Sequence, residues 1–192
     1  MEAKMPGKRK PSKKPALPEI DYRSQVALAP DIQPQEDLPR YLFALASEVA
    51  KRWHREDRYV GALLIVGSFA SARRCCASGM RQLGKGNPLA GVFISADSPE
   101  FAEMLANADS AFGDGAVVID VTGQVLGAGA YLVVDHPEAE IPEEGGSRHL
   151  AASSASIRPD INAVVTISEE SLRVRLFVGG RITALFDPAK DA

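Results

Sequence analysis

The sequence predicts a single α/β domain, in which helices flank a mixed β-sheet. Residues 37–54 carry apolar side chains every three to four positions, the spacing of an amphipathic helix. Residues 59–66 form an unbroken apolar run of strand length, typical of a strand that is buried on both faces. Helix-like and strand-like segments continue to alternate after it, and that pattern is typical of sheets packed against helices.

The middle of the chain continues this alternation. A polar stretch that contains Arg73 and Arg74 follows the first strand, where the expected order of elements has the second helix, and a strand is expected near residues 90–95. Ser98 is a suitable N-cap residue and Pro99 a suitable first residue, which predicts a helix through residue 105.

Turn-forming residues divide the second half into short elements. The expected strands are 116–121, 125–134, 163–167, 173–178 and 182–186, and a short helix is expected over 147–157. Thr122-Gly123-Gln124 predicts a hairpin-type turn between the first two strands, and Gly179-Gly180 predicts a tight turn between the last two. The sheet is therefore expected to be antiparallel toward its ends.

Composition favours one domain with a tail. Residues 1–35 are rich in proline and predict a disordered basic leader, and residues 36–188 predict the domain. Residues 1–14 carry a net charge of +5, so the rest of the chain carries −8 of the total of −3. An acidic body disfavours nucleic-acid binding, since phosphate contacts dominate such affinity. The basic tail could still contact nucleic acid or an anionic surface, although a solvated leader is the favoured interpretation.

Several protein classes do not fit the sequence. It has no apolar run of the roughly 18 residues that a membrane span needs. The N-terminus lacks the apolar core of a secretory signal. The two cysteines, Cys75 and Cys76, are adjacent, which disfavours a disulfide framework and a structural zinc site. A cytoplasmic location is expected.

Two short stretches carry the residues best suited to chemistry. Gly113-Asp114-Gly115-Ala116 places a carboxylate before an apolar run, and Gly146-Ser147-Arg148-His149 places three polar side chains at the start of a predicted helix. A carboxylate can hold a divalent cation, and a helix N-terminus favours anions. Together they fit a nucleoside triphosphate. Taken separately, Asp114 could be a turn residue, Ser147 an N-cap and Arg148 a solvated charge.

Five blocks in order resemble the diadenylate cyclase domain, which condenses two ATP molecules into cyclic di-AMP. They are residues 61–66, Asp114-Gly115-Ala116, Ala130-Tyr131-Leu132, Gly146-Ser147-Arg148-His149 and Ser168-Glu169-Glu170-Ser171. The resemblance covers residues 37–187. Each block is weak alone, but five in the family's order are specific.

The resemblance implies roles for individual residues. Asp114, Gly115 and Ala116 would be catalytic, with Asp114 holding Mg²⁺ or Mn²⁺; Ser147, Arg148, His149, Ser168 and Glu169 would bind ATP and its phosphates; and Tyr131 and Leu132 would line the adenine pocket. Ordinary half-buried strand residues remain the alternative for Tyr131 and Leu132. A turn between strands remains the alternative for residues 168–169.

Two positions depart from the family pattern. Gly113 stands where the family usually has histidine, and Leu150 stands where it usually has a second arginine. A catalytically weakened module that binds ATP or cyclic di-AMP is therefore the alternative function.

The resemblance also implies a homodimer or higher oligomer, in which two ATP molecules meet head to head. Arg73, Arg74 and Lys85 could support such an interface or belong to a solvated loop.

Overall fold

The computed structural model describes residues 37–75, 89, 92–107, 112, 115–136, 138–139 and 145–191. Its helices are α1 (Leu38–Arg55), α2 (Phe69–Cys75), α3 (Pro99–Ala106), α4 (Ser147–Ser156) and α5 (Pro188–Asp191). Its strands are β1 (Ala62–Gly67), β2 (Ala116–Ile119), β3 (Val125–Ala130), β4 (Ile161–Ile167), β5 (Val174–Val178) and β6 (Arg181–Phe186). The predicted leader at residues 1–35 lies outside the described residues, as do Lys85, Gly113 and Asp114.

The strands form one six-stranded sheet in the order β3-β2-β1-β4-β5-β6. Strands β1 and β2 pair in parallel, with Ile65 opposite Val118. The other four pairings are antiparallel. The predicted mixed sheet with antiparallel ends is therefore confirmed. Strand β1 lies at its centre, and all six of its residues are buried, as its unbroken apolar run indicates.

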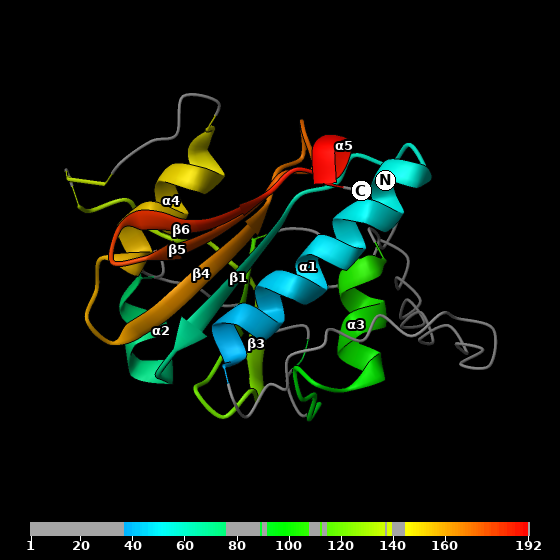
Figure 1. Ribbon diagram of the computed structural model, residues 1–192. Helices are drawn as coiled ribbons and strands as arrows, with labels where there is room; N and C mark the ends of the chain where they lie inside the picture. Colours follow the sequence, from blue (N-terminus) through cyan, green and yellow to red (C-terminus); the bar gives the residue numbers. More distant parts are fainter. Residues whose placement is uncertain are drawn as a thin grey trace, which may run out of the picture.

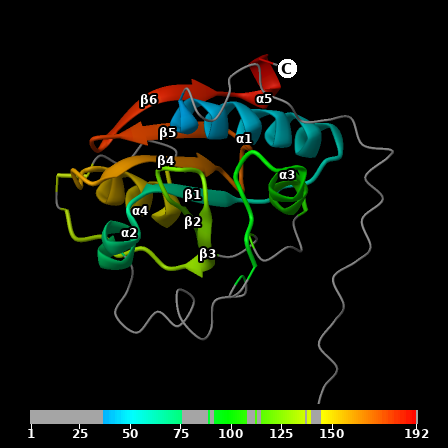
Figure 2. The ribbon, with the colours of Figure 1, turned by 90° about the horizontal axis from the view of Figure 1, so that it is seen from below.

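Helices cover both faces of the sheet and make a three-layer α/β domain (Figures 1 and 2). Helices α1 and α3 lie on one face, over a core that includes Leu64 and Val66 of β1. Helices α2 and α4 lie on the other face, over a smaller core that includes Leu63 and Ile65. Successive residues of a strand point to opposite faces, so one apolar strand supplies both cores.

Two of the expected strands differ in the structure. Residues 92–94 form no strand, and Ser95 makes only an isolated bridge to Gln124. Phe93 is 91% exposed there, so burial does not stabilise an extended pairing. The strand expected over 125–134 ends at Ala130. Beyond it, the backbone N–H groups of Asp135 and His136 donate to Ser154 Oγ of α4, at 3.2 and 3.3 Å, instead of to a strand.

Local sequence signals explain several element boundaries. The hydroxyl of Ser98 accepts a hydrogen bond from the N–H of Phe101 at 3.1 Å and begins α3 as predicted. Gly179 and Gly180 both have positive φ in the turn between β5 and β6. Helix α5 was not expected from the sequence. No helix among the described residues combines the length and the apolar character that crossing a bilayer requires.

Candidate functional site

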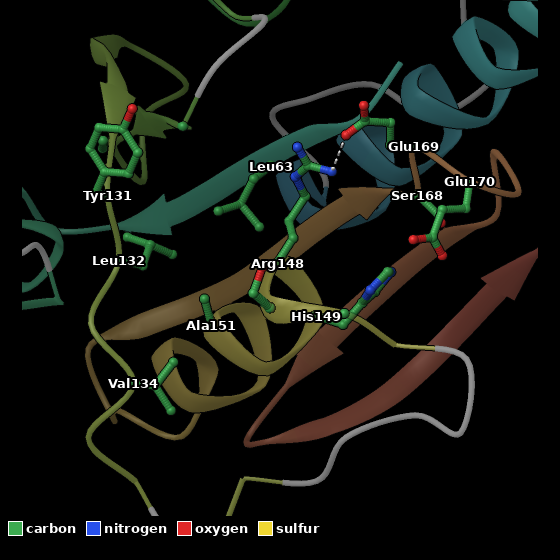
Figure 3. A pocket seen from close by; sticks show the side chains of 14 residues that line it. Leu63, Tyr131, Leu132, Val134, Arg148, His149, Ala151, Ser168, Glu169 and Glu170 are labelled. Carbon is green, nitrogen blue, oxygen red and sulfur yellow. Dashed lines mark ion pairs between the residues drawn. The ribbon is translucent and has the colours of Figure 1, made fainter. Parts of the chain in front are cut away.

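A pocket of about 450 Å³ lies where β1, the end of β3, the first turn of α4 and the turn after β4 meet (Figure 3). The residues that line it are Leu63, Gly115, Ala130, Tyr131, Leu132, Val134, Gly146, Ser147, Arg148, His149, Ala151, Ser168, Glu169 and Glu170. Its walls are apolar on the side of β3 and polar on the side of α4 and the β4–β5 turn. A ligand with an apolar ring and an anionic group matches this division.

Most of the residues singled out in the sequence meet in this pocket. Gly115, Tyr131, Leu132, Ser147, Arg148, His149, Ser168 and Glu169 all line it, although they come from four separate segments. Ala116 does not line it among the described residues, because its side chain is fully buried in the core on the α4 side. Asp114, the expected metal ligand, lies outside the described residues.

Arg148 extends from the first turn of α4 toward β1. Its guanidinium lies against Gly61, where an added Cβ would overlap it. Its Nη1 atom is 3.7 Å from Glu169 Oε2, across the pocket (Figure 3). Both side chains are partly exposed, at 30% and 65%, so this ion pair stabilises the fold little. An anionic ligand can therefore replace Glu169 beside Arg148 at small cost.

The N-cap of α4 is Gly146, so the alternative in which Ser147 serves as the N-cap is not borne out. The carbonyl of Gly146 accepts from the N–H groups of His149 and Leu150, at 3.1 and 3.2 Å, and no side chain caps the helix. Ser147 is instead the first helical residue and is exposed. Ser147 lines the pocket at a helix N-terminus, a location that favours anions.

His149 forms part of the polar wall of the pocket and is buried, with 4% of its surface exposed. Its Nε2 atom lies 2.9 Å from Nη1 of Arg175, which β5 places beneath α4. Burial, and then the charges of Arg175 and Arg148, lower the pKa of His149 from 6.5 to about 4. The imidazole is therefore neutral at physiological pH.

The acidic segment after β4 forms a turn that also lines the pocket. The N–H of Ser168 donates to the carbonyl of Arg173 at 3.0 Å, and the N–H of Leu172 donates to the carbonyl of Ser168 at 2.9 Å. This turn buries Ser168 and leaves Glu169 and Glu170 exposed at the rim. The segment is therefore both a turn between strands and part of the pocket wall.

The apolar wall is the segment that follows β3, in which Leu132 makes an isolated bridge. Tyr131 is 51% exposed, and Leu132 is half-buried against the smaller core. Two contacts hold the residues that follow against α4. Ser154 Oγ accepts the two backbone N–H groups described above, and Arg158 forms an ion pair with Asp135.

Gly115 turns the chain at the floor of the pocket. Its φ of +76° lies in the left-handed region, and an added Cβ would approach the carbonyl carbon of Gly129 to 2.6 Å. Glycine is needed here by the backbone conformation and by the close approach of β3. This reason is additional to the expected approach of a nucleotide.

The described carboxylates suit a cation that a ligand helps to bind. Among these residues, no three His, Cys, Asp or Glu side chains come together as a metal site. Glu169 and Glu170 offer hard oxygen donors at the rim. Magnesium-like ions commonly use one or two carboxylates together with phosphates and waters, so this donor set fits such an ion only beside a phosphorylated ligand.

Sequence reasoning missed several pocket residues. Leu63, Val134, Ala151 and Glu170 line the pocket without having been assigned to it individually. It also missed Arg175, whose signal was a charged residue inside the apolar run Val174–Val178. Leu150 stands where the family usually has a second arginine. It is half-buried on α4 and is not among the described residues that line the pocket.

Known proteins share this sequence pattern. Residues 51–182 match the DAC family model, described as DisA bacterial checkpoint controller nucleotide-binding. A diadenylate cyclase of Methanocaldococcus jannaschii is 32% identical over 148 residues, which are 77% of this chain and 44% of that protein. A diadenylate cyclase of Haloferax volcanii is 31% identical over 150 residues, 78% of this chain and 52% of that protein. The chain spans about half the length of these relatives.

Solved structures share the fold. DacA from Staphylococcus aureus, as a double mutant, aligns with a TM-score of 0.52 and 21% identity, over 81% of this chain and 90% of that one. A hypothetical membrane spanning protein from Bacillus cereus aligns with a TM-score of 0.51 and 19% identity, over 76% and 62%. These likenesses concern the fold alone. The family match covers more than half of the chain, and the chain therefore belongs to the DAC family of DisA-type nucleotide-binding domains.

Proposed function

We propose that this protein is a diadenylate cyclase, which joins two ATP molecules into cyclic di-AMP and releases pyrophosphate. The observation that carries the proposal is the pocket itself. It combines an apolar wall at Tyr131 and Leu132 with a polar wall at Arg148 and His149, and both walls come from blocks that resemble the family. The two relatives named diadenylate cyclase support the same activity.

Each wall of the pocket would contact a different part of the ATP molecule. Tyr131 and Leu132 offer apolar surface for the adenine ring. Arg148 offers a planar set of donors to phosphate oxygens, and Ser147 adds a hydroxyl at the N-terminus of α4. Binding would therefore place the phosphates at the polar end of the pocket, and orientation of this kind contributes much of the rate enhancement in phosphoryl transfer.

A divalent cation, Mg²⁺ or Mn²⁺, fits the proposed reaction. Asp114 would hold it, and Glu169 is the described carboxylate that could assist. When bound, such an ion neutralises charge on the phosphates and makes a 3′-hydroxyl more acidic. The contribution of Arg148 is separate, because it binds phosphate oxygens whether or not a metal is present.

The reaction requires two nucleotides that face each other. The 3′-oxygen of each ATP attacks the α-phosphorus of the other, its proton departs, and the bond to the β-phosphate breaks to release pyrophosphate. One pocket holds one ATP, so we infer that two copies of the chain meet head to head during turnover. The rate per protein molecule should then rise with protein concentration at saturating ATP.

Incubation of the purified chain with ATP and Mn²⁺ or Mg²⁺ tests the proposal. Mass spectrometry should detect cyclic di-AMP with the wild-type chain, and Asp114→Asn should abolish it. Arg148→Met should weaken ATP binding by about 10-fold or more, on the scale of a hydrogen bond to a charged group. Arg181→Met removes the same charge from the exposed start of β6 and should leave turnover unchanged.

Three outcomes would count against the proposal. ATP binding without any product, across both metals and a range of protein concentrations, would favour the weakened binding module. Failure to bind ATP at all would reject the pocket as a nucleotide site. Product from the Asp114→Asn chain at the wild-type rate would reject the catalytic assignment.

A further inference from the structure

A buried arginine lies behind the polar wall of the pocket. Arg175 is 4% exposed, and it points to the α4 face of the sheet, opposite its strand neighbours Val174 and Leu176. Burial lowers the pKa of Arg175, and Asp187 partly opposes that effect. Asp187 is itself bonded to Arg173 Nε at 2.9 Å. Within the described part of the chain, no carboxylate lies at ion-pair distance from Arg175.

The hydrogen bond from Arg175 determines the state of His149. A guanidinium can only donate, so Nε2 of His149 must accept the bond of 2.9 Å. A neutral imidazole then carries its proton on Nδ1. The Nδ1 atom is buried and has no hydrogen-bond partner among the described residues. The same is true of Thr166 Oγ1, on the residue that pairs with Arg175 across the sheet.

Buried polar atoms without partners are uncommon, and a buried cation without a counter-ion is costly. Here both occur within one cluster, directly behind a pocket wall that already carries Arg148. An anionic ligand in the pocket would supply the missing negative charge and an acceptor for the Nδ1–H group of His149. A cluster with only a structural role would be better served by apolar side chains of the same size.

We propose that Arg175 is a positioning residue of this pocket, which holds His149 as the neutral Nδ1–H tautomer and adds a buried positive charge behind the phosphate-binding wall to the partly exposed charge of Arg148. The inference rests on the proposed function, in which the ligand is an anionic nucleotide. His149 then serves the pocket as a neutral hydrogen-bond donor. The cationic charges of this wall are those of Arg148 and Arg175.

Nitrogen NMR of the full chain tests the first half of the proposal. The chain has three histidines, so three imidazole signals are expected, and His149→Gln assigns the relevant one. At pH 7 the wild-type His149 should be neutral and protonated on Nδ1. Arg175→Met should move the proton toward Nε2, because the donor to Nε2 is lost. Arg175→Lys, which keeps a cationic donor, should restore the Nδ1–H form, and Arg181→Met should change nothing.

Calorimetry tests the second half, with ATP, inorganic triphosphate and adenosine as separate probes. Arg175→Met should weaken the binding of ATP and of triphosphate by about 10-fold, which is the scale of one hydrogen bond to a charged group. The affinity for adenosine should not change. Arg175→Lys should recover part of this loss, and Arg181→Met should bind all three probes as the wild type does. Equal loss for adenosine would indicate a general disruption and overturn the proposal.

The outcomes separate the two proposals. An Nε2–H or imidazolium form of His149 in the wild type at pH 7 overturns the positioning role without any variant, and so does wild-type triphosphate affinity in Arg175→Met. If Arg175→Met does not fold, the wild-type spectrum and Arg175→Lys still decide the question. A wild-type chain with the expected His149 spectrum that binds neither ATP nor triphosphate overturns the proposed function instead.

Discussion

At the scale of single residues, the position of Arg148 depends on a neighbour without a side chain. The guanidinium occupies the space that a Cβ of residue 61 would need. The obstructing atoms are the far end of a flexible side chain, so the fold can accommodate Gly61→Ala by moving Arg148. The residue that we assign to phosphate binding would then be displaced.

Gly61→Ala should therefore weaken ATP binding several-fold while changing the free energy of unfolding by less than about 1 kcal/mol. Calorimetry measures the first quantity and urea unfolding the second. The double variant Gly61→Ala with Arg148→Met should bind ATP no more weakly than Arg148→Met alone. Additive losses would show that Gly61 acts independently of Arg148.

The lowered pKa of His149 predicts how the free energy of unfolding depends on pH. Arg148 from its own helix, Arg175 from β5, and Glu169 and Glu170 from the β4–β5 turn are the charged groups around it. Its folded-state pKa of about 4 lies below the ordinary 6.5, so the unfolded chain binds the proton more readily. The contribution of neutral His149 is complete above about pH 6.5 and is lost as the pH falls toward 4.

The free energy of unfolding should thus decrease between pH 6.5 and 4, by up to about 1.4 kcal/mol per pH unit from this group. Urea unfolding of the wild type and of His149→Gln at matched pH values isolates the effect. The variant should show a shallower pH dependence over this window. Parallel curves for the two proteins would contradict the lowered pKa.

At the scale of elements, periodicity and turn chemistry predicted most of the fold. The apolar spacing of α1, the Ser98 cap of α3 and the Gly179-Gly180 turn are local signals, and each appears as expected. Residues 92–95 and 131–134 differ because tertiary contacts decide them. The first segment leaves Phe93 exposed, and the second leads into Asp135 and His136, whose backbone N–H groups donate to Ser154 Oγ. Neither the exposure of Phe93 nor the contact with Ser154 can be read from a short window of sequence.

A substitution at Gly115 tests how closely the pocket floor packs against β3. Alanine there would have to adopt a φ of +76° and approach Gly129 to 2.6 Å. Gly179 is a matched control, because its φ is also positive, at +58°, but its surroundings are open. Gly179→Ala should cost about 1 kcal/mol of stability from the backbone alone. Gly115→Ala should cost at least about 1 kcal/mol more, since the added carbon overlaps a backbone.

Chemical unfolding of the two variants measures this difference. Equal losses would mean that β3 moves aside freely, and the close packing at the pocket floor would then be unimportant. The comparison is independent of any activity.

Ser154 tests the contact that holds the apolar wall against α4. Ser154→Ala removes the acceptor of two backbone N–H groups, so the segment that follows Leu132 should loosen. ATP affinity should fall a few-fold, along with about 1 kcal/mol of stability. Ser156→Ala is the control, because Ser156 Oγ accepts from Gly180 N at 2.9 Å, on the side of the β5–β6 turn.

Both serine variants should lose similar stability in urea unfolding. Only Ser154→Ala should change ATP affinity in calorimetry. An equal change in affinity for Ser156→Ala would show that the loss follows general stability and not the position of the wall.

At the scale of the whole molecule, the order of the motifs predicted the site better than any single residue did. Motif order indicated that residues near 115, 131, 148 and 168 belong together, and the sheet brings them around one pocket. It could not reveal Arg175, because the contact with His149 depends on α4 crossing β5. Nor could it reveal that Gly146, and not Ser147, caps α4. Such details depend on packing between distant segments.

The pairing of two pockets also belongs to this scale. The described residues form the single pocket that we propose as a nucleotide site, and the proposed reaction needs two such sites. If Asp114, Arg148 and His149 have the roles that we propose, turnover requires an assembly of at least two chains.

The stoichiometry of the reaction tests the central claim most directly. The purified chain is incubated with ATP and Mn²⁺, and ATP, pyrophosphate and cyclic di-AMP are measured in the same sample. We predict two ATP consumed and two pyrophosphate released for each cyclic di-AMP formed, with no product from Asp114→Asn. ATP that is bound but not consumed, or consumed without cyclic di-AMP, would contradict the assignment of this pocket as a diadenylate cyclase site.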